Sequence, residues 1–335
     1  MKALSKPTIY EVARRAGVSI ATVSRALRGS QLVTAETRRR VVEAAEALSF
    51  TPSRSARSLA EGRHAANGIV FPHLVGPYYA EVLLGYEEAA AELGRSVLIL
   101  GTEGRPDATA QVLDLAGRVD GLVVMGRTVP DEVVVELAAS GLPIVLLARE
   151  PVDGLDTIRS ENWAAARELT AHLLAHGHRR LVFLGDPDAS PDVADRYRGF
   201  VAASGKRAPV RCAFDVDAGL AAARTLLRRR IPPDALFCAN DEIALGAHLA
   251  AAAEGRDVPG DIAITGWDDV MAARFVGLTT VRQPMRELGA TAARWLHDRM
   301  STPEAHPVRH RVIPTRLVVR RSCGPDPCEG RQVDP

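Results

Sequence analysis

Seven short apolar runs, separated by longer stretches with helical periodicity, occupy residues 67 to 265. Runs of four or five apolar residues bounded by turn residues are typical of strands buried on both faces of a parallel sheet. The runs fall into two successive series, so the pattern predicts two doubly wound α/β lobes. The runs are 68–71, 96–100, 121–125, 144–147, 181–184, 235–238 and 262–265, with helices expected between them, for example over 79–93 and 131–140.

Polar and aromatic side chains follow directly after several of these predicted strands. Ligands of doubly wound sheets bind beyond the carboxyl ends of the strands, so we expect a cleft between the lobes that brings these side chains together. Planar donors and acceptors that straddle neighbouring hydroxyl groups, with an aromatic ring against the apolar face, are the chemistry of a polyol site. The candidates are Arg196, Asn240, Asp241 and Asp268 for the polar contacts, and Tyr78, Tyr79 or Trp267 for the ring.

Residues 8 to 48 carry a different pattern, that of three short helices. Thr8 and Glu11 form a capping box before the first helix, Gly17 ends it in a tight turn, and Ser19 caps a second helix over 20–27. A third helix begins after a cap at residue 34. Its apolar positions at helical spacing are Val41, Val42, Ala45 and Leu48.

The second of these helices has one apolar and one largely polar side. Val23 and Leu27 are expected to face inward, which leaves polar residues on the outside. A helix, a glycine-containing turn and a second helix with an exposed polar side are typical of the helix-turn-helix, whose second helix enters the major groove of DNA. An ordinary three-helix interaction module is the alternative.

The charge of the chain is distributed unevenly. The first 63 residues hold twelve Lys/Arg and five Asp/Glu, a net charge of +7, whereas the whole chain carries only +1. A basic segment attached to an acidic body indicates a polyanion-binding domain, because Lys and Arg that neutralise phosphates release condensed counterions. A solvated helical surface would also account for charge alone.

The amino-acid sequence of the first 60 residues is similar to that of the LacI/GalR family of bacterial transcription regulators. The matching phrases are Thr8 to Ala13, Ala16 to Ser19, Thr22 to Arg25, Val33-Thr34, Thr37-Arg38, Ala47-Leu48, Phe50, Pro52 and Ala56 to Leu59. The resemblance implies that residues at Ile20, Ala21 and Arg25 face base edges, and that a hinge helix ending at Leu59 wedges into the minor groove. The DNA-contacting residues it implies here are Thr8, Ser19, Ile20, Ala21, Thr22, Ser24, Arg25, Arg28, Ala56 and Leu59.

Physical chemistry fits these implied roles. Arg25 can make two parallel hydrogen bonds to guanine, while Ile20 and Ala21 discriminate by apolar fit, for instance against thymine methyl groups. Arg25 is alternatively a phosphate contact or a surface ion pair. Leu59 is alternatively a core residue at the domain junction. The eight residues 53–60 are too few for a stable isolated helix, so we expect them to order only when DNA or a partner subunit buries Leu59.

The body is also similar to this family, to about residue 321. Matching phrases include Gly177 to Arg180, Arg196 to Phe200, Asn240 to Gly246, Val258 to Asp261 and Leu278 to Pro284. The resemblance implies a periplasmic-binding-protein-like sugar sensor. Its effector-contacting residues would be Tyr78, Tyr79, Arg196, Asn240, Asp268 and, near the lobe crossover, Gln283.

Some positions have structural alternatives, and others depart from the family pattern. Asp241 and Asp269 are alternatively helix caps or partners at the lobe hinge, and His178 packs at a turn. Family members often carry an acid after the strand that ends near residue 147, where this chain has Ala148-Arg149-Glu150. The loop after the first strand carries His73 and Gly76 where Asp and Asn are common.

These features predict four segments: a helix-turn-helix domain over 1–52, a hinge helix and linker over 53–63, a two-lobed effector-binding and dimerisation domain over 64–321, and a disordered tail over 322–335. Cys323 and Cys328 could bind a metal, but the sequence places no third or fourth ligand near them, so we expect no metal and no cofactor. The other two cysteines are too scattered for a disulfide framework, which suits a reducing cytoplasm.

Several features of the sequence argue against other classes of protein. No apolar run approaches the eighteen or so residues of a membrane helix, and no signal peptide is recognisable. Phosphate-binding, dinucleotide-binding and nucleophile-elbow motifs are absent, which argues against an enzyme, and the basic N-terminal segment argues against a free-standing solute-binding protein. We therefore expect a cytoplasmic homodimeric repressor of carbohydrate-utilisation genes, released from a near-palindromic operator by a small sugar. A nucleoside, purine or other non-sugar co-repressor is the alternative.

Overall fold

The computed structural model describes residues 7–27, 29–50, 64–205, 207–302 and 305–324. The chain divides into two compact units, Met1–His64 and Ala65–Pro335, which are called the head and the body and are described separately. No helix in the described ranges is long and apolar enough to cross a membrane.

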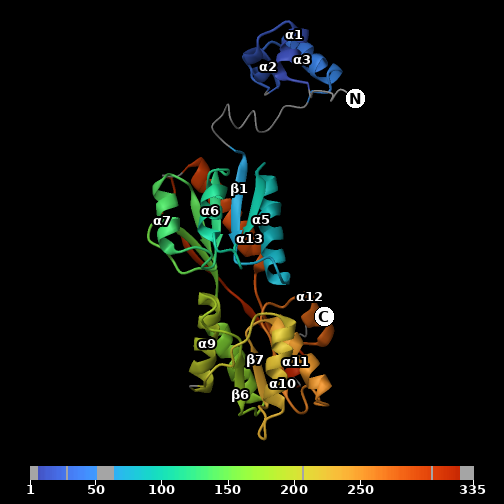
Figure 1. Cartoon of the computed structure of the whole chain (residues 1–335), viewed down its shortest axis with the longest axis vertical. Helices are drawn as coiled ribbons and strands as arrows, with labels where there is room; N and C mark the ends of the chain where they lie inside the picture. Colours follow the sequence, from blue (N-terminus) through green and yellow to red (C-terminus); the bar gives the residue numbers. More distant parts are fainter. Residues whose placement is uncertain (1–6, 28, 51–63, 206, 303–304, 325–335) are drawn as a thin grey trace. The chain divides into compact units, whose positions relative to one another are not determined.

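In its described residues the head has three helices packed around a small apolar core (Figure 1). They are α1 (Ile9–Ala16), α2 (Ile20–Leu27) and α3 (Ala35–Ala47). Each helix contributes one fully buried valine to the core: Val12, Val23 and Val41. The predicted helix-turn-helix arrangement is therefore present, with the expected bounds for α2.

The turn signals of the head act as the sequence predicts. Gly17 has a φ of 64°, which favours glycine and ends α1. The hydroxyl of Ser19 accepts a hydrogen bond of 3.1 Å from the backbone N–H of Thr22 and so caps α2. The apolar face of α3 was partly mispredicted: Val42 is 38% exposed, and Ala44 is buried in its place.

The first lobe of the body is a six-stranded parallel sheet with strand order β10-β5-β4-β3-β1-β2. The strands are β1 (Ala66–Phe71), β2 (Ser96–Gly101), β3 (Gly121–Met125), β4 (Ile144–Leu147), β5 (Asp156–Ser160) and β10 (His310–Ile313). The first four correspond to predicted apolar runs. The last two were not predicted: β5 has a single apolar residue, Ile158, and β10 has two polar residues followed by two apolar ones.

Helices cover both faces of this sheet (Figure 1). Alternate residues of β3 point to opposite faces: Val123 joins the core with α5 (Pro77–Glu92) and α13 (Met285–Ser301), and Val124 joins the core with α6 (Ala108–Ala116) and α7 (Asp131–Ala139). Burial on both faces explains why these strands read as continuous apolar runs.

Close backbone contact joins α5 to α13. A Cβ added at Gly85 would lie 2.1 Å from the carbonyl oxygen of Arg286, and one added at Gly289 would lie 2.0 Å from that of Val82. Each helix therefore offers a glycine to the backbone of the other.

The second lobe is a three-stranded parallel sheet with order β6-β7-β8 around a single large core. Its strands are β6 (Leu181–Leu184), β7 (Ala235–Cys238) and β8 (Ala263–Thr265). Its helices are α8 (Trp163–Ala175), α9 (Pro191–Ser204), α10 (Val216–Leu227), α11 (Asp241–Ala253) and α12 (Met271–Val276). The predicted second α/β series is thus present.

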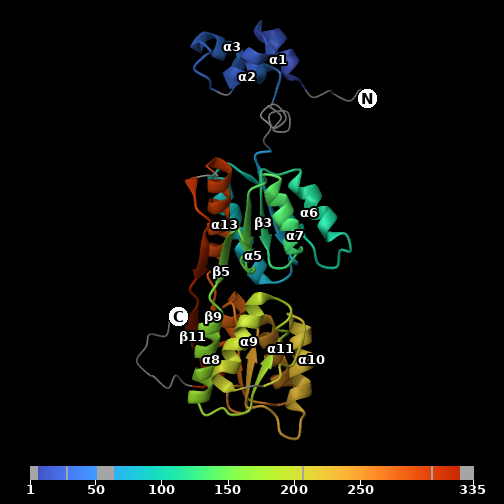
Figure 2. The same ribbon diagram turned by 90° about the vertical axis from the view of Figure 1, so that its left-hand side faces the viewer.

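The described chain passes between the lobes three times: after β5, after β9 (Thr280–Arg282), and between β10 and β11 (Arg316–Val318). β9 and β11 pair antiparallel (Figure 2). The first lobe is consequently discontinuous in sequence, because α13 and β10 belong to it but follow most of the second lobe along the chain.

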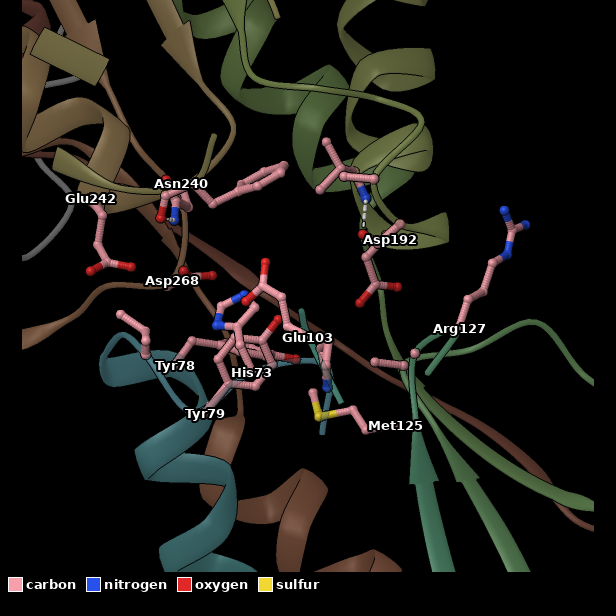
Figure 3. A pocket seen from close by; sticks show the side chains of 18 of the residues that line it. His73, Tyr78, Tyr79, Glu103, Met125, Arg127, Asp192, Asn240, Glu242 and Asp268 are labelled. Carbon is pink, nitrogen blue, oxygen red and sulfur yellow. Dashed lines mark hydrogen bonds between the residues drawn. The ribbon is translucent and has the colours of Figure 1, made fainter. Parts of the chain in front are cut away.

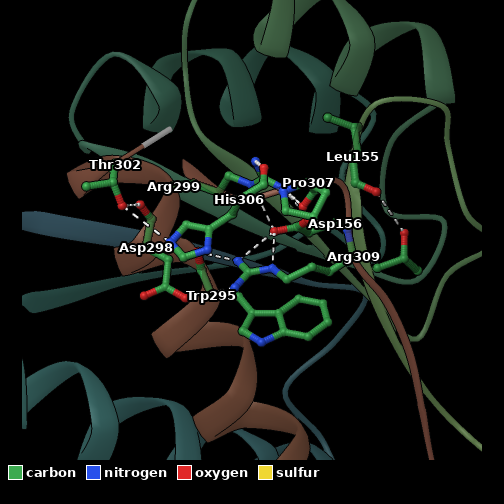
Figure 4. Close-up of polar contacts among 10 residues, drawn as sticks. Leu155, Asp156, Trp295, Asp298, Arg299, Thr302, His306, Pro307 and Arg309 are labelled. Carbon is green, nitrogen blue, oxygen red and sulfur yellow. Dashed lines mark hydrogen bonds and ion pairs between the residues drawn. The ribbon is translucent and has the colours of Figure 1, made fainter. Parts of the chain in front are cut away.

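A buried carboxylate fastens this returning segment to the first lobe (Figure 4). Asp156, at the start of β5, accepts hydrogen bonds of 2.9 and 2.7 Å from Arg299 of α13, and of 2.8 Å from the Arg309 guanidinium. Arg309 also lies over the Trp295 ring, 4.4 Å from its centre. Burial opposes ionisation of Asp156, but the hydrogen bonds from the two arginines outweigh it and hold its pKa below the ordinary value.

The folded body extends beyond residue 321, which corrects the predicted start of the tail. Ser322 and Cys323 are each 1% exposed and belong to a final 3-10 turn, η2 (Arg321–Cys323). The Ser322 hydroxyl accepts from the N–H of Thr279 at 2.8 Å, so this turn is bonded to the second lobe. Residues 325–335 of the predicted tail lie outside the described residues.

Candidate DNA-binding face and effector pocket

The outer side of α2 consists of the residues that its core contacts leave over. Val23 and Ala26 are buried against α1 and α3 and fix the rotation of the helix. Ile20 is 39% exposed, and Ala21 and Arg25 are exposed with it. The three residues that the family resemblance places against base edges therefore share the solvent side of one helix.

The other head residues predicted to contact DNA are partly committed to the fold. The Ser19 hydroxyl caps α2 and lies 2.9 Å from that of Thr22. Thr8 donates to the Glu11 carboxylate from its backbone N–H at 2.7 Å and from its hydroxyl at 3.1 Å, which lowers the pKa of Glu11. Ser24 is half-buried on α2. Arg28, Ala56 and Leu59 lie outside the described residues.

Part of the positive charge of the head stabilises the head itself. Arg38 donates a hydrogen bond of 2.8 Å to the carbonyl of Ser30, and Arg40 donates to the carbonyl of Ala16. Both side chains tie α3 to the turns on either side of α2. The net charge of the segment alone did not distinguish these structural arginines from arginines that face solvent.

A cavity of about 290 Å³ lies between the two lobes of the body. It is near the lower end of the range of roughly 300–1,000 Å³ that ligand pockets occupy. Figure 3 shows its side chains gathered around one space, with α5 contributing from the first lobe and the loops after β6, β7 and β8 from the second. Six predicted effector-binding residues line it: Tyr78, Tyr79, Arg196, Asn240, Asp268 and Gln283.

The two tyrosines come from the first turn of α5, which begins at the carboxyl end of β1. Gly76, at φ 90°, and Pro77 start this helix directly beside the cavity. The Tyr79 ring packs edge-on against the His73 ring, with centroids 4.5 Å apart. The Tyr78 hydroxyl is buried with no hydrogen-bond partner among the described residues. Burial raises the pKa of Tyr78, so this hydroxyl stays protonated at neutral pH and can donate a hydrogen bond.

Arg196 is held in the cavity wall by three contacts. Its Nε donates to Oδ1 of Asn162 at 2.8 Å, its Nη1 donates to the carbonyl of Ala239 at 2.7 Å, and its guanidinium lies 4.7 Å from the centre of the Trp267 ring. Trp267 was predicted to cover a ligand ring. It is instead fully buried beneath Arg196 and does not line the cavity, because its side chain points into the core of the second lobe.

Asp268 and Gln283 form a second fixed unit in the lining of the cavity. Gln283 donates from Nε2 to Oδ1 of Asp268 at 2.6 Å, and both residues are buried. Asp268 has a φ of 117°, a conformation that costs on the order of 1–3 kcal/mol in a residue other than glycine. Burial raises the pKa of Asp268, against the opposing charge of Arg196. Such strain and such a shift are frequent where a side chain must be presented to a ligand.

Two family models match the chain. The model of bacterial regulatory proteins of the lacI family matches residues 8–53, and a periplasmic binding protein-like domain matches residues 170–323. Catabolite control protein A of Priestia megaterium is 32% identical over 330 residues, covering 94% of this chain and 98% of that protein. The chain belongs to the LacI family. It is a DNA-binding transcriptional regulator, as predicted, and not an enzyme.

Other relatives of this LacI-family regulator have solved structures. A lac repressor dimer bound to operator and the anti-inducer ONPF superposes with a TM-score of 0.85 at 27% identity, over 96% of this chain and 100% of that one. A complex of the transcriptional regulator CelR with cellobiose is 30% identical, with a TM-score of 0.70, over 94% of this chain and 99% of that one. The predicted fold class is confirmed.

Asn240 lines the cavity but is already occupied in capping α11. Its Oδ1 accepts from the N–H of Ile243 at 2.9 Å, and its Nδ2 donates to the carbonyl of Phe214 at 3.4 Å. The second bond is long, so Nδ2 has capacity for a ligand. The Asn240 oxygen is fixed by the fold.

Acidic residues that were not singled out from the sequence also line the cavity: Glu103, Asp192 and Glu242. Asp192, in the first turn of α9, is 6% exposed, and its Oδ1 has no hydrogen-bond partner in the part of the chain that the structure describes. Burial raises the pKa of Asp192 and of Glu242. Asp192 follows β6 in the chain, in the first turn of α9, and the sequence pattern gave no signal for the direction of its side chain.

Asp241 and Asp269 serve the lobe crossover, as their structural alternative proposed. The buried Asp241 carboxylate accepts from the Val270 N–H at 2.9 Å and from the Thr280 hydroxyl at 2.6 Å. Asp269 is paired with Arg282 and, at 2.7 Å, with Arg320. These bonds hold β9 and the strand beside it against the second lobe.

The segment that departs from the family pattern is also structural. Arg149 is 2% exposed and is bonded to Asp131 and, at 3.0 Å, to the carbonyl of Gly126. Glu150 pairs with Arg159 at 2.8 Å. Only Ala148 of this segment lines the cavity, so this part of the first lobe offers a methyl group where relatives often have an acid.

Proposed function

We propose that this LacI-family regulator is a homodimeric repressor of carbohydrate-utilisation genes that acts in the cytoplasm. It binds a near-palindromic operator through α2, and a small sugar in the cavity between the lobes releases it. A single short recognition helix reads too few base pairs to be selective, so doubling by a two-fold axis follows from the size of the head.

The observation that carries the sugar assignment is the composition of the cavity. Arg196, Asp268 and Gln283 present fixed donors and acceptors, and the phenol of Tyr78 adds a buried donor. Tyr79 offers an aromatic surface beside them. Rigid polar groups around an aromatic face match a ring that carries several hydroxyl groups.

The charge of the cavity restricts the class of sugar. Four carboxyl groups line it, from Glu103, Asp192, Glu242 and Asp268, against two guanidinium groups, from Arg127 and Arg196. Burial already raises the pKa of Asp192, Glu242 and Asp268, so the cavity disfavours negative charge, and an anionic ligand would add to it. We therefore expect a neutral or cationic polyol rather than a sugar phosphate or a sugar acid.

The test measures, by calorimetry, the affinity of the purified full-length protein for matched pairs of sugars. Neutral pentoses, hexoses and disaccharides are compared with the phosphates of the same sugars. Binding of a neutral member with no binding of its phosphate supports the proposal. Tight binding of a phosphate, or of a purine base with no sugar bound, contradicts it.

The direction of the response is tested by operator titration with and without the identified sugar. A ligand that bridges two lobes shifts the equilibrium only by its differential affinity for two arrangements. A coupling of about 1–3 kcal/mol would release the operator over a useful range of sugar concentration. Tighter operator binding in the presence of the sugar would make this a co-repressed regulator.

The hinge residues Ala56 and Leu59 remain part of the proposal through the family resemblance alone. Leu59→Ala is expected to weaken operator binding strongly, because the apolar wedge that offsets unstacking is lost. The melting temperature of the protein without DNA should not change. A large fall in melting temperature with operator affinity intact would identify Leu59 as an ordinary core residue.

A further inference from the structure

Three potential metal ligands converge at the end of α8 in the second lobe, and none of them lines the cavity between the lobes. His172 and His176 lie four residues apart at the end of α8, so helical periodicity puts them on the same face, with ring centroids 4.6 Å apart. Cys323 of η2 meets them from the end of the described chain. Its Sγ lies 3.1 Å from Nε2 of His172, and all three ligand atoms lie within 4.8 Å of one another.

These separations are close to those of a tetrahedral zinc site. Zinc–nitrogen bonds of about 2.0–2.1 Å and a zinc–sulfur bond of about 2.3 Å put neighbouring ligand atoms roughly 3.3–3.6 Å apart. The 3.1 Å between Sγ of Cys323 and Nε2 of His172 is close to this spacing, and all three ligand atoms lie within 4.8 Å of one another. Two imidazoles and a thiolate favour zinc or a similar transition metal over magnesium or calcium, which prefer oxygen ligands.

The cysteine is held in place by bonds that do not depend on a metal. Cys323 is 1% exposed, and its Sγ lies 3.1 Å from the Thr279 hydroxyl. Thr279 also accepts from the N–H of Arg320 at 2.9 Å, and Ser322 donates to the carbonyl of Ile264 at 2.5 Å. Hydrogen bonds behind the ligands of a metal orient them and raise its affinity.

Gly324, the residue after Cys323, lies so close to the His176 ring that a larger side chain would crowd it. A Cβ added at Gly324 would lie 3.0 Å from Nδ1 of His176, and the φ of Gly324 is 108°. Glycine thus allows the chain to leave Cys323 directly alongside the histidine ring. No third or fourth ligand is near Cys323 in sequence, so the sequence predicted no metal here, but the fold brings two potential ligands to it from the end of α8.

We propose that His172, His176 and Cys323 bind one Zn²⁺ ion, which fastens the end of the folded chain to α8. The thiol of Cys323 releases its proton to solvent when the ion binds, and the imidazoles bind as neutral ligands. Thr279, which contacts the cysteine, immediately precedes β9, and β9 leads to Gln283 in the cavity wall. The site therefore stabilises the segment that connects the second lobe to the effector pocket.

The test begins with full-length protein freed of metal by a chelator and titrated with Co²⁺ and then Zn²⁺. One equivalent of Co²⁺ should produce the near-ultraviolet charge-transfer band of a cobalt–thiolate bond, and one equivalent of Zn²⁺ should abolish it. Zn²⁺ should also raise the melting temperature, because it binds only the folded state tightly. Absence of the charge-transfer band overturns the proposal.

Variants assign the ligands. Cys323→Ser should remove the band, and His172→Gln and His176→Gln should each weaken Zn²⁺ binding by about 100-fold or more. His172 and His176 are not fully buried, so their variants report on binding even where the cysteine variant fails to fold. Unchanged Zn²⁺ affinity in both histidine variants contradicts the proposal.

Two matched controls separate this site from adventitious binding. His178→Gln changes a neighbouring ring, whose centroid lies 6.4 Å from that of His176, and should leave Zn²⁺ affinity unchanged. Cys328→Ser should retain the charge-transfer band, since Cys323 supplies the thiolate. Loss of the band in Cys328→Ser together with its retention in Cys323→Ser would place the metal elsewhere.

Discussion

The side chain of Gln283 donates a hydrogen bond of 2.6 Å to the carboxyl group of Asp268 and so joins the lobe crossover to the wall of the effector cavity. Gln283 lies between β9 and α13, where the chain returns to the first lobe. A ligand that replaced or strengthened this bond would act directly on the segment between β9 and α13, which crosses from one lobe to the other. The pair therefore brings a residue of the crossover into direct contact with the wall of the cavity.

Asp268→Asn should reduce affinity for the effector while leaving operator binding in place. Loss of a charge-assisted hydrogen bond to a buried hydroxyl costs roughly 1.5–3 kcal/mol, about a 10- to 150-fold loss of affinity. Asparagine tolerates a positive φ, so the loop should keep its conformation. Calorimetry with the identified sugar measures the change, and Asp188→Asn, at an exposed carboxylate outside the cavity, is the control. Unchanged affinity in Asp268→Asn would remove this residue from the site.

Arg25→Ala should weaken binding to the preferred operator by about 1–3 kcal/mol and relax the choice of base at one position in each half-site. The reason is the loss of paired hydrogen bonds from the exposed side of α2. Arg39→Ala removes the same charge from α3, where Arg39 pairs with Glu43, and should leave the base preference unchanged. Binding selections from random DNA read out both variants. Equal weakening on all sequences in Arg25→Ala would indicate a phosphate contact instead.

Asp156→Asn should destabilise the body by about 3–5 kcal/mol, because two partly buried guanidinium groups lose their carboxylate. Since the pKa of Asp156 is lowered on folding, its contribution is present above the unfolded pKa of about 3.9 and is lost as the pH falls below that value. Urea unfolding at pH 7 measures the difference. Asp298→Asn, which removes a more exposed partner of Arg309, should cost less than about 1 kcal/mol.

Lowering the pH from 7 to 5 should weaken the second lobe through His248 of α11. Burial, assisted by the charge of Arg321, lowers the pKa of His248 to about 4. The unfolded chain takes up this proton near pH 6.5 and the folded chain does not, so stability is present above that pH and decreases toward pH 4. The expected loss is about 1–3 kcal/mol. His248→Gln should flatten this dependence, whereas His310→Gln, at an exposed position, should not.

The sequence predicted those parts of the fold whose burial is visible as an apolar pattern. β4, with four fully apolar residues, lies where its run predicts it. β5 was missed because it begins with Asp156 and also contains Arg159, whose burial depends on charged partners far away in sequence. A pattern of apolar residues cannot reveal a strand whose polar groups are satisfied by tertiary contacts.

The candidate site followed a general rule about strand ends, and the rule has limits. It placed Arg196 and Asp268 in one cavity, because the carboxyl ends of parallel strands share an edge. It was wrong for Trp267, since the direction of a side chain after a strand depends on the local course of the loop. It also could not join Cys323 to His172, because no local signal spans that distance in sequence.

The discontinuity of the first lobe determines the order in which a newly synthesised chain can fold. The described helices of the head end at residue 47. Most of the second lobe is then translated before α13 and β10, the last elements of the first lobe. The face of the sheet that α13 covers stays exposed until about residue 301 has been translated, and β10 ends only at residue 313. The described helices of the head are therefore translated well before the first lobe of the body is complete. Chains interrupted before α13 would carry that head with part of the apolar sheet uncovered, a form prone to aggregation.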